Sequence, residues 1–246
     1  MQVNQAVCGF SSNFMAAVSP QITKSYAAGN YSYMMTLIYQ GARLSYYMLL
    51  LLSLPIIINA NYVLNIWLKI VPEHAVFFVR LVLVFSMCES ISNPLITAML
   101  ATGNIRNYQI IVGGLQMFNL PISYILLRMG GIPETVLIVS IIISQCCLVA
   151  RLVMLRKMIG LSARNFLKKV YLNVIGVTLL SAIIPLIAFY NLKDSFISFV
   201  VVTVLSLIST ALVIFYVGCT SNERLFVIEK GKNMIRHFLE KKDDRN

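Results

Sequence analysis

Seven apolar stretches of 18 to 27 residues divide this chain, and their length constrains the fold more than any other feature. They cover residues 2–19, 44–68, 75–101, 108–127, 132–155, 170–190 and 196–217. A helix needs roughly 20 apolar residues to cross about 30 Å of hydrocarbon. With 59% hydrophobic and 12% charged residues, the composition is also too apolar for one soluble core. The sequence therefore predicts an all-α fold, a polytopic helical membrane protein with about seven transmembrane helices.

Positive charge is distributed unevenly between the connections. Sixteen of the twenty Lys and Arg residues fall in or beside the first, third and fifth connections and the C-terminal tail. The other side carries only Lys69, Arg80, Arg128 and Lys193. Because cytoplasmic loops retain the excess of positive charge, we expect the tail to be cytoplasmic and Met1 to lie on the outer side. Topology and contact with membrane lipids then account for the net charge of +11, which requires no nucleic acid.

Signals for processing, metal binding and catalysis are weak. The first residues lack the basic region and short apolar core of a cleavable signal peptide, so we expect the first helix to be retained. Five cysteines lie in or beside the apolar stretches without zinc-site spacing, which favours packing and no metal. We find no phosphate-binding glycine loop and no acid/base pair, so we expect neither a cofactor nor an enzyme. His74 is interpreted as a solvated residue of an outer connection.

Local composition predicts where several helices end. Pro20 is expected to end the first helix, with residues 21–40 forming a polar, tyrosine-rich connection. The basic connection over residues 156–169 is predicted to form an interfacial amphipathic helix. Residues 222–246 place apolar side chains on approximately one face, so this tail is expected to lie on the membrane, with residues 241–246 disordered.

Glu89 is the first candidate for a functional residue, because it lies near the middle of the third stretch. An ionised side chain costs about 2.5 to 3.5 kcal/mol there. Its polar stripe also contains Ser86, Ser90, Asn93 and Thr97. We weigh two alternatives equally: an ion-binding or cavity-lining group, or a neutral packing carboxyl. Arg80 lies on the opposite helical face, about 13.5 Å away along the axis, and is interpreted as reaching the outer interface.

Uncharged polar residues form a stripe along the first stretch. Gln5, Ser12 and Asn13 share one helical face with Gly9. Inside a membrane, such a face is expected to turn toward partner helices or a wet cavity. Hydrogen bonding between helices and cavity lining are equal alternatives for this stripe.

A similar stripe runs along the fourth stretch. Gln116 and Asn119 share a face there with Gln109 and Ser123, and Pro121 is expected to interrupt the helix. Amides and hydroxyls of this kind suit the hydroxyl groups of sugars, which need many moderate donors and acceptors. They suit hydrogen bonds between helices equally well.

Several short motifs connect this chain to a known family. They are QVN at 2–4, GF at 9–10, NF at 13–14, PQITKSYA at 20–27, GN at 29–30, SNPL at 92–95, ATGNIRNY at 101–108 and NLPISY at 119–124. Together they resemble the oligosaccharide flippases of the multidrug and polysaccharide exporter superfamily. The likeness spans essentially the whole chain.

The resemblance implies a domain organisation. Family members have about fourteen helices in two lobes, and this chain resembles helices eight to fourteen. Residues 1–155 are then an incomplete C-terminal lobe with five transmembrane helices. Residues 156–217 are the basic connection with two further transmembrane helices, and residues 218–246 are a cytoplasmic amphipathic tail. The missing lobe, or another chain that supplies it, is the expected partner.

The same resemblance implies a function. Family members move undecaprenyl-pyrophosphate-linked oligosaccharide across the bacterial inner membrane by alternating access, which makes this lipid-linked sugar and the membrane lipids the expected ligands. On charge alone, Arg43, Arg80 and Arg151 are candidates for pairing with phosphate. Glu89 is the candidate for a coupling ion.

Other functions remain open at this point. One alternative is a multidrug-type exporter of the same superfamily with a narrower, more apolar cavity. Another is a non-transporting remnant or assembly subunit that depends on a second chain. A seven-helix receptor ranks last, because no lysine within a span is placed for a retinal-type linkage.

Overall fold

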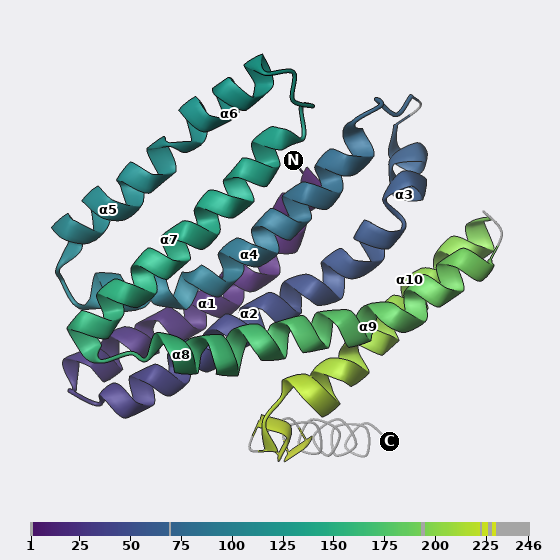
Figure 1. Cartoon of the computed structure of the whole chain (residues 1–246). Coiled ribbons are helices and arrows are strands. Elements are labelled where there is room, and N and C mark those ends of the chain that lie inside the picture. Colours follow the sequence, from purple (N-terminus) through teal and green to yellow (C-terminus); the bar gives the residue numbers. More distant parts are fainter. Residues whose placement is uncertain (1, 69, 193–194, 222, 226–227, 230–246) are drawn as a thin grey trace, which may run out of the picture.

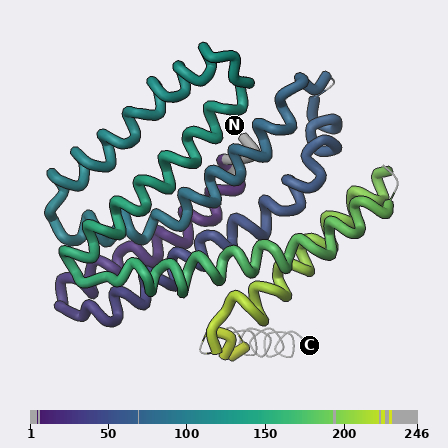
Figure 2. Tube along the Cα trace, in the orientation of Figure 1, coloured from purple at the N-terminus to yellow at the C-terminus, as the bar shows by residue number. Residues whose placement is uncertain are grey.

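The protein is a bundle of helices in which successive long helices mostly run in opposite directions, shown by a computed structural model (Figures 1 and 2). It describes residues 2–68, 70–192, 195–221, 223–225 and 228–229, and these contain no strand. Within these residues, six helices are long and apolar enough to cross a membrane: Tyr31–Ile58, Ala75–Ala101, Ile105–Arg128, Thr135–Ile159, Ala163–Asn191 and Phe196–Gly218. The predicted all-α, multi-pass membrane fold is thereby confirmed. The first of the seven predicted stretches, over 2–19, is helical but is not among these six.

The first two helices form a hairpin where a polar connection was predicted. Helix α1 (Gln2–Ala27) contains Pro20, and only three residues separate it from α2 (Tyr31–Ile58). The prediction that Pro20 ends the helix is therefore wrong. Pro20 lies on the exposed side of α1, where a helix can bend outward to accommodate the ring. The turn forms instead at Gly29, which has a φ of 70°, and the Asn30 side chain caps α2.

The second helix breaks before it reaches the end of its apolar stretch. Helix α2 ends at Ile58 and the short α3 (Ala60–Trp67) continues in a different direction (Figure 1). At the break, Asn59 donates a hydrogen bond from Nδ2 to the carbonyl of Pro55 at 3.2 Å. Proline cannot donate to the carbonyl one turn before it, so Pro55 loosens this part of the helix.

Helix α4 (Ala75–Ala101) is the centre of the bundle and packs against α1, α2 and α7. Gly41 permits the close approach of α2, since a Cβ at this position would lie 3.1 Å from Cγ of Pro94 and 3.6 Å from Cγ1 of Val18. Buried side chains such as Ile38 and Leu95 continue the same interface. The core therefore lies between α1, α2, α4 and α7 and continues into the second half of the chain, where Val174 and Val202 belong to the same cluster.

Two further helices line the edge of the bundle beside α7 (Thr135–Ile159). They are α5 (Ile105–Met117) and α6 (Asn119–Arg128), separated by Phe118. The interruption predicted from Pro121 is confirmed, since Pro121 lies in the first turn of α6, where a missing N–H is tolerated.

The basic connection is part of the membrane-crossing helices. Helix α7 continues to Ile159 and ends at Gly160, which has a φ of 73°. A short α8 (Ala163–Phe166), a π-helical turn η1 (Leu167–Tyr171) and α9 (Leu172–Asn191) then follow without interruption. The predicted interfacial helix over 156–169 is therefore wrong. Leu161 and Phe166 are fully buried, so packing holds this segment against the bundle.

The last helix, α10 (Phe196–Val213), packs along α9 and α2 and ends in a second π-helical turn, η2 (Ile214–Gly218). Of the predicted amphipathic tail over 222–246, only 223–225 and 228–229 are described. The rest, including 241–246, lies outside the described residues, and its predicted placement on the membrane stays a prediction.

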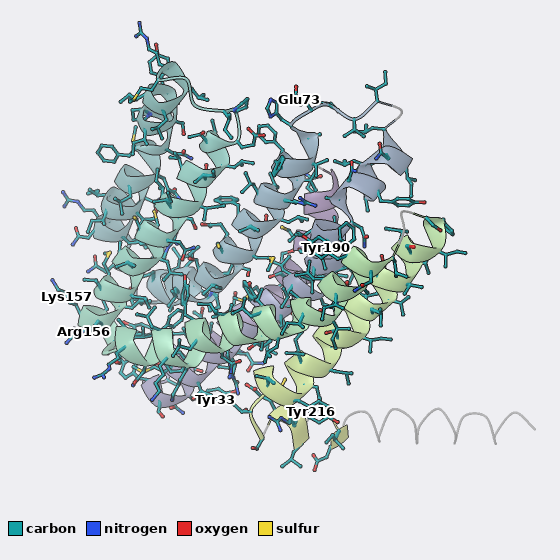
Figure 3. All side chains as sticks on the ribbon, turned by 45° about the vertical axis from the view of Figure 1, so that its right-hand side comes forward. Tyr33, Glu73, Arg156, Lys157, Tyr190 and Tyr216 are labelled. Carbon is teal, nitrogen blue, oxygen red and sulfur yellow. The ribbon has the colours of Figure 1, made fainter. Side chains whose placement is uncertain are left out.

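One end of the bundle collects most of the described positive charge, and we call it the basic end. It contains the α1–α2, α4–α5 and α7–α8 turns and residues 218–221. Its described basic residues are Lys24, Arg106, Arg156, Lys157, Arg164, Lys168, Lys169 and Arg224. Figure 3 shows Arg156 and Lys157 at this end and Glu73 at the opposite end. The helices thus run between ends of very different charge.

Replacing Gly41 by valine is expected to destabilise the bundle by about 1 to 3 kcal/mol, because the new side chain would force α2 and α4 apart. The matched control is Gly176→Val in α9, where an added Cβ would meet no heavy atom within 4 Å. Thermal unfolding of purified protein measures both variants. Equal losses from the two substitutions would show that helix propensity, and not the contact with Pro94, sets the cost.

Candidate functional site

Glu89 lies halfway along α4, at the edge of its contact with α7. Its carboxylate accepts a hydrogen bond from Oγ of Ser144, and the side chain is half-buried. Asn93, one turn further along, is also half-buried. On the neighbouring part of the stripe, Thr97 lies 3.1 Å from the hydroxyl of Ser19 in α1. The polar stripe of α4 therefore runs between α1 and α7 and is only partly covered by them.

The polar face of α1 points out of the bundle. Gln5, Ser12 and Asn13 are exposed, whereas Met15 and Ile22 on the other side pack into the core. The hydroxyl of Ser12 donates only to its own helix, at the carbonyl three residues earlier. This face consequently makes no side-chain hydrogen bond to α2 or α4 through Ser12. Polar groups at membrane depth are expected to face protein or water, not lipid.

In the polar stripe of the fourth span, some residues pack against α7 and others are exposed. Asn119 donates from Nδ2 to Oγ of Ser140 in α7 at 2.9 Å, and Ser123 donates to Oδ1 of Asn119 at 3.1 Å. These residues hold α6 against α7. Gln116 and Gln109 are exposed and are the part of this stripe that can contact a ligand.

Arg43 is buried in α2 near the basic end and is neutralised by the chain itself. Its Nη2 lies 2.7 Å from Oε1 of Glu223, just beyond η2. One turn along α2, Tyr47 donates to Oδ1 of Asn173 at 2.9 Å, and its ring packs directly against Gly218. Arg43 thus joins α2 to the segment after α10. Its ion pair must break before the guanidinium can bind a phosphate group.

Arg80 stabilises the break between α2 and α3. Its Nε donates to the carbonyl of Ile57 at 3.0 Å, an acceptor near the end of α2 that the interrupted helix leaves free. The side chain is half-buried and forms no ion pair with a described residue. Arg80 lies far from Glu89, as its position on the helix predicts, and near the end opposite the basic end.

Arg151 lies in the core of the bundle on α7, with only 2% of its surface exposed. Its Nε and Nη1 have no hydrogen-bond partner among the described residues. It shares the helical face of Ser144, seven residues and about 10.5 Å away along the axis. A buried guanidinium with unsatisfied donors is costly, and an anion that accepts these hydrogen bonds would offset that cost.

A second polar cluster lies among α2, α7, η1 and α9, and the sequence did not identify it. The hydroxyl of Tyr46 lies 3.0 Å from that of Thr178, and Tyr171 donates to Oε1 of Gln145. Tyrosines inside apolar stretches were the available signal. Their partners lie 132 and 26 residues away in the chain, so sequence spacing could not pair them.

His74 has a specific partner, which corrects its interpretation as a simply solvated residue. Its Nδ1 lies 2.7 Å from Oε1 of Glu134, which joins the α3–α4 connection to the start of α7. A hydrogen bond from its own backbone N–H, together with the imidazole of His74, holds the pKa of Glu134 below its usual range. This contact lies at the end opposite the basic end.

The seven candidate residues do not converge on one pocket. Glu89 and Asn93 share a partly open face of α4, and Gln116 is exposed at the edge of the bundle. Asn119 packs against α7. The three candidate arginines occupy three separate places: Arg43 in an ion pair, Arg80 at a helix break and Arg151 in the core.

Comparison with known proteins adds no family. No family model, no curated protein and no solved structure matches this chain. The resemblance to oligosaccharide flippases therefore stays a prediction from short motifs.

Replacing either Arg43 or Glu223 by glutamine is expected to lower the free energy of unfolding by about 2 to 5 kcal/mol, because the remaining charge is left buried and unpaired. The double variant should lose less than the sum of the two single variants, since the pair is then removed as a unit. Thermal unfolding in detergent of the parent protein, the two single variants and the double variant measures these differences.

Arg106→Gln is the matched control, because Arg106 is an exposed arginine at the same end of the bundle. It should change the free energy of unfolding by less than about 0.5 kcal/mol. Additive losses in the Arg43 and Glu223 cycle would contradict a direct ion pair.

Proposed function

We propose that this chain is one lobe of a transporter and that the outward polar faces of α1 and α4 form one wall of its cavity. The observation that carries the proposal is the exposure of Gln5, Ser12 and Asn13 beside the half-buried Glu89 and Asn93. Asn13 lies near the middle of the 26-residue α1. Polar side chains at this depth belong against protein or water, and a cavity between two lobes provides both.

The substrate that we propose is an oligosaccharide linked through pyrophosphate to a membrane lipid. Uncharged amides and hydroxyls suit sugar hydroxyl groups, and both α1 and the exposed Gln116 supply them. The buried guanidinium of Arg151 has donors that would suit a phosphate oxygen. The motif resemblance described above supports the same substrate class.

Alternating access requires a second wall that moves against this one. We propose that the missing lobe, or another chain that supplies it, covers the polar face of α1 and α4. On the positive-inside rule, the basic end lies in the cytoplasm, here of a bacterial cell with the bundle in its inner membrane. A pyrophosphate group would therefore approach from the side where positive charge is concentrated.

Glu89→Gln is expected to lower transport by the complete, assembled protein roughly tenfold while its abundance in the membrane stays within about twofold. The substitution preserves the shape of the side chain and an acceptor for Ser144, so it removes the ionisable group and not the packing. Transfer of a labelled lipid-linked oligosaccharide in reconstituted vesicles measures transport, and immunoblotting of membranes measures abundance.

Glu73→Gln is the control, because this acidic residue is exposed in a connection outside the spans. It should leave both transport and abundance unchanged. If Glu89→Gln reduced transport and abundance equally, Glu89 would be a packing residue. It would then have no functional role in the proposed cavity wall.

The proposed orientation predicts where the C-terminus lies. A fluorescent protein fused after Asn246 should be bright, because it folds in the cytoplasm, while alkaline phosphatase fused at the same position should be inactive. Comparing the two fusions in growing cells measures the orientation directly. Active phosphatase would place the basic end outside the cytoplasm and overturn the proposed orientation.

A further inference from the structure

A large apolar cavity lies at the end of the bundle opposite the basic end. Its volume is about 680 Å³, and its walls come from α3, α4, the end of α2 and the first residues of α1 and α7. Among its described lining residues, Gln5 is the only one without an apolar or aromatic side chain, and it is also the only one that belongs to the proposed transport surface. Glu89, Asn93, Ser12 and Asn13 do not line it. The cavity therefore adjoins that surface at Gln5 and is otherwise lined by different residues.

The cavity originates at the break between α2 and α3. Because α3 turns away after Asn59, its inner face and that of α4 separate, with Leu64 on one side and Val82 and Phe85 on the other. Trp67 forms part of the rim, with 54% of its surface exposed. The capping bond from Arg80 to Ile57 stabilises this arrangement. The cavity is thus built into the fold by a specific helix interruption.

Its depth matches one leaflet of a bilayer. The lining residues of α4 extend from Ala75 at the helix start to Phe85, ten residues further on. Ten helical residues rise about 15 Å, which is half of a hydrocarbon core of about 30 Å. Since α4 is long and apolar enough to cross the membrane, the cavity faces the hydrocarbon of the leaflet at this end.

The lining of the cavity suits a hydrocarbon chain. Apart from Gln5, its described lining residues are apolar or aromatic, and its volume is about 680 Å³. An apolar lining disfavours water, which needs several polar partners. A flexible hydrocarbon chain needs no polar partner.

A positive charge lies beside the cavity. Arg80 follows the lining residue Val79, and its hydrogen bond to Ile57 uses only Nε. The guanidinium forms no ion pair with a described residue, and the side chain is half-buried. Arginine side chains near a helix end extend toward the headgroup level, where lipid phosphates lie. Arg80 can therefore pair with a phosphate while the attached chain occupies the cavity.

We propose that this cavity binds one acyl chain of a phospholipid from the leaflet at this end, with the Arg80 guanidinium against the lipid phosphate. The site requires only that the helices cross a membrane, so it does not depend on the proposed transport function. A bound acyl chain would fill the space beside α3 and stabilise the break at Asn59.

The test uses the full chain in vesicles of phosphatidylethanolamine and phosphatidylglycerol that contain a phosphatidylglycerol with a photoactivatable diazirine on one acyl chain. After illumination, peptide mass spectrometry locates the crosslinks. We expect them on α3 and on residues 75–85 of α4. Val82→Trp, which fills the cavity, should reduce this labelling roughly tenfold. Val84→Trp on the same helix, whose position does not line the cavity, should leave it unchanged.

Arg80 is tested separately with the same probe. Arg80→Gln should reduce cavity labelling by the phosphatidylglycerol probe several-fold, while Arg80→Lys, which keeps the charge, should retain most of it. A diazirine-bearing fatty alcohol, which has no phosphate, should label all three proteins equally. Circular dichroism and thermal unfolding of each variant confirm that it is folded.

Three results would overturn the site. The first is labelling spread evenly over the exposed faces of α7 and α9 with no enrichment at the cavity. The second is equal labelling of the parent and Val82→Trp proteins. The third is the absence of crosslinks on α3 and α4 in the parent protein, which would show that something other than lipid occupies the cavity. Equal labelling of the parent and Arg80→Gln proteins by the phosphatidylglycerol probe would overturn the role of Arg80.

Discussion

Hydrocarbon gives a backbone N–H or C=O group no solvent partner, and this constraint governs how the helices of the bundle end and break. At the break after α2, side chains of Asn59 and Arg80 satisfy the carbonyls of Pro55 and Ile57. At the end of η2, Arg224 donates to the carbonyls of Tyr216 and Cys219. At both of these irregular points, polar side chains therefore replace the missing backbone partner, and the break after α2 also opens the apolar cavity.

The fold could be predicted where the length and hydropathy of a segment decide its structure. The predictions failed where packing against other helices decides it. The stretch predicted over 75–101 coincides with α4, because an apolar run of that length has one stable form in a membrane. The prediction for Pro20 failed because proline breaks a helix only if the freed carbonyl cannot adjust, and Pro20 is exposed. The prediction for 156–169 failed because charge suggested an interface, whereas Leu161 and Phe166 are buried in the core.

The candidate site was predictable in its parts and not in its pairings. Helical periodicity correctly grouped Glu89 with Asn93 on one face of α4. It could not show that Arg43 would meet Glu223, because that contact depends on how α2 and α10 pack. Which side chains meet across two helices depends on how each helix is rotated and tilted against the other. The local sequence of one helix does not determine these angles. The exposed side of α1 was likewise left open by the sequence, and packing of Met15 and Ile22 decides it.

The ion pair between Arg43 and Glu223 also has a consequence for biogenesis. The two residues are 180 positions apart, so the ribosome makes the carboxylate long after α2 has left it. At about 5 to 20 residues per second, the delay is roughly 10 to 35 seconds. During that interval Arg43 has no carboxylate from Glu223, and the insertion machinery or lipid headgroups must accommodate its charge. Synthesis of the segment that contains Glu223 is therefore the step that allows the ion pair of Arg43 to form.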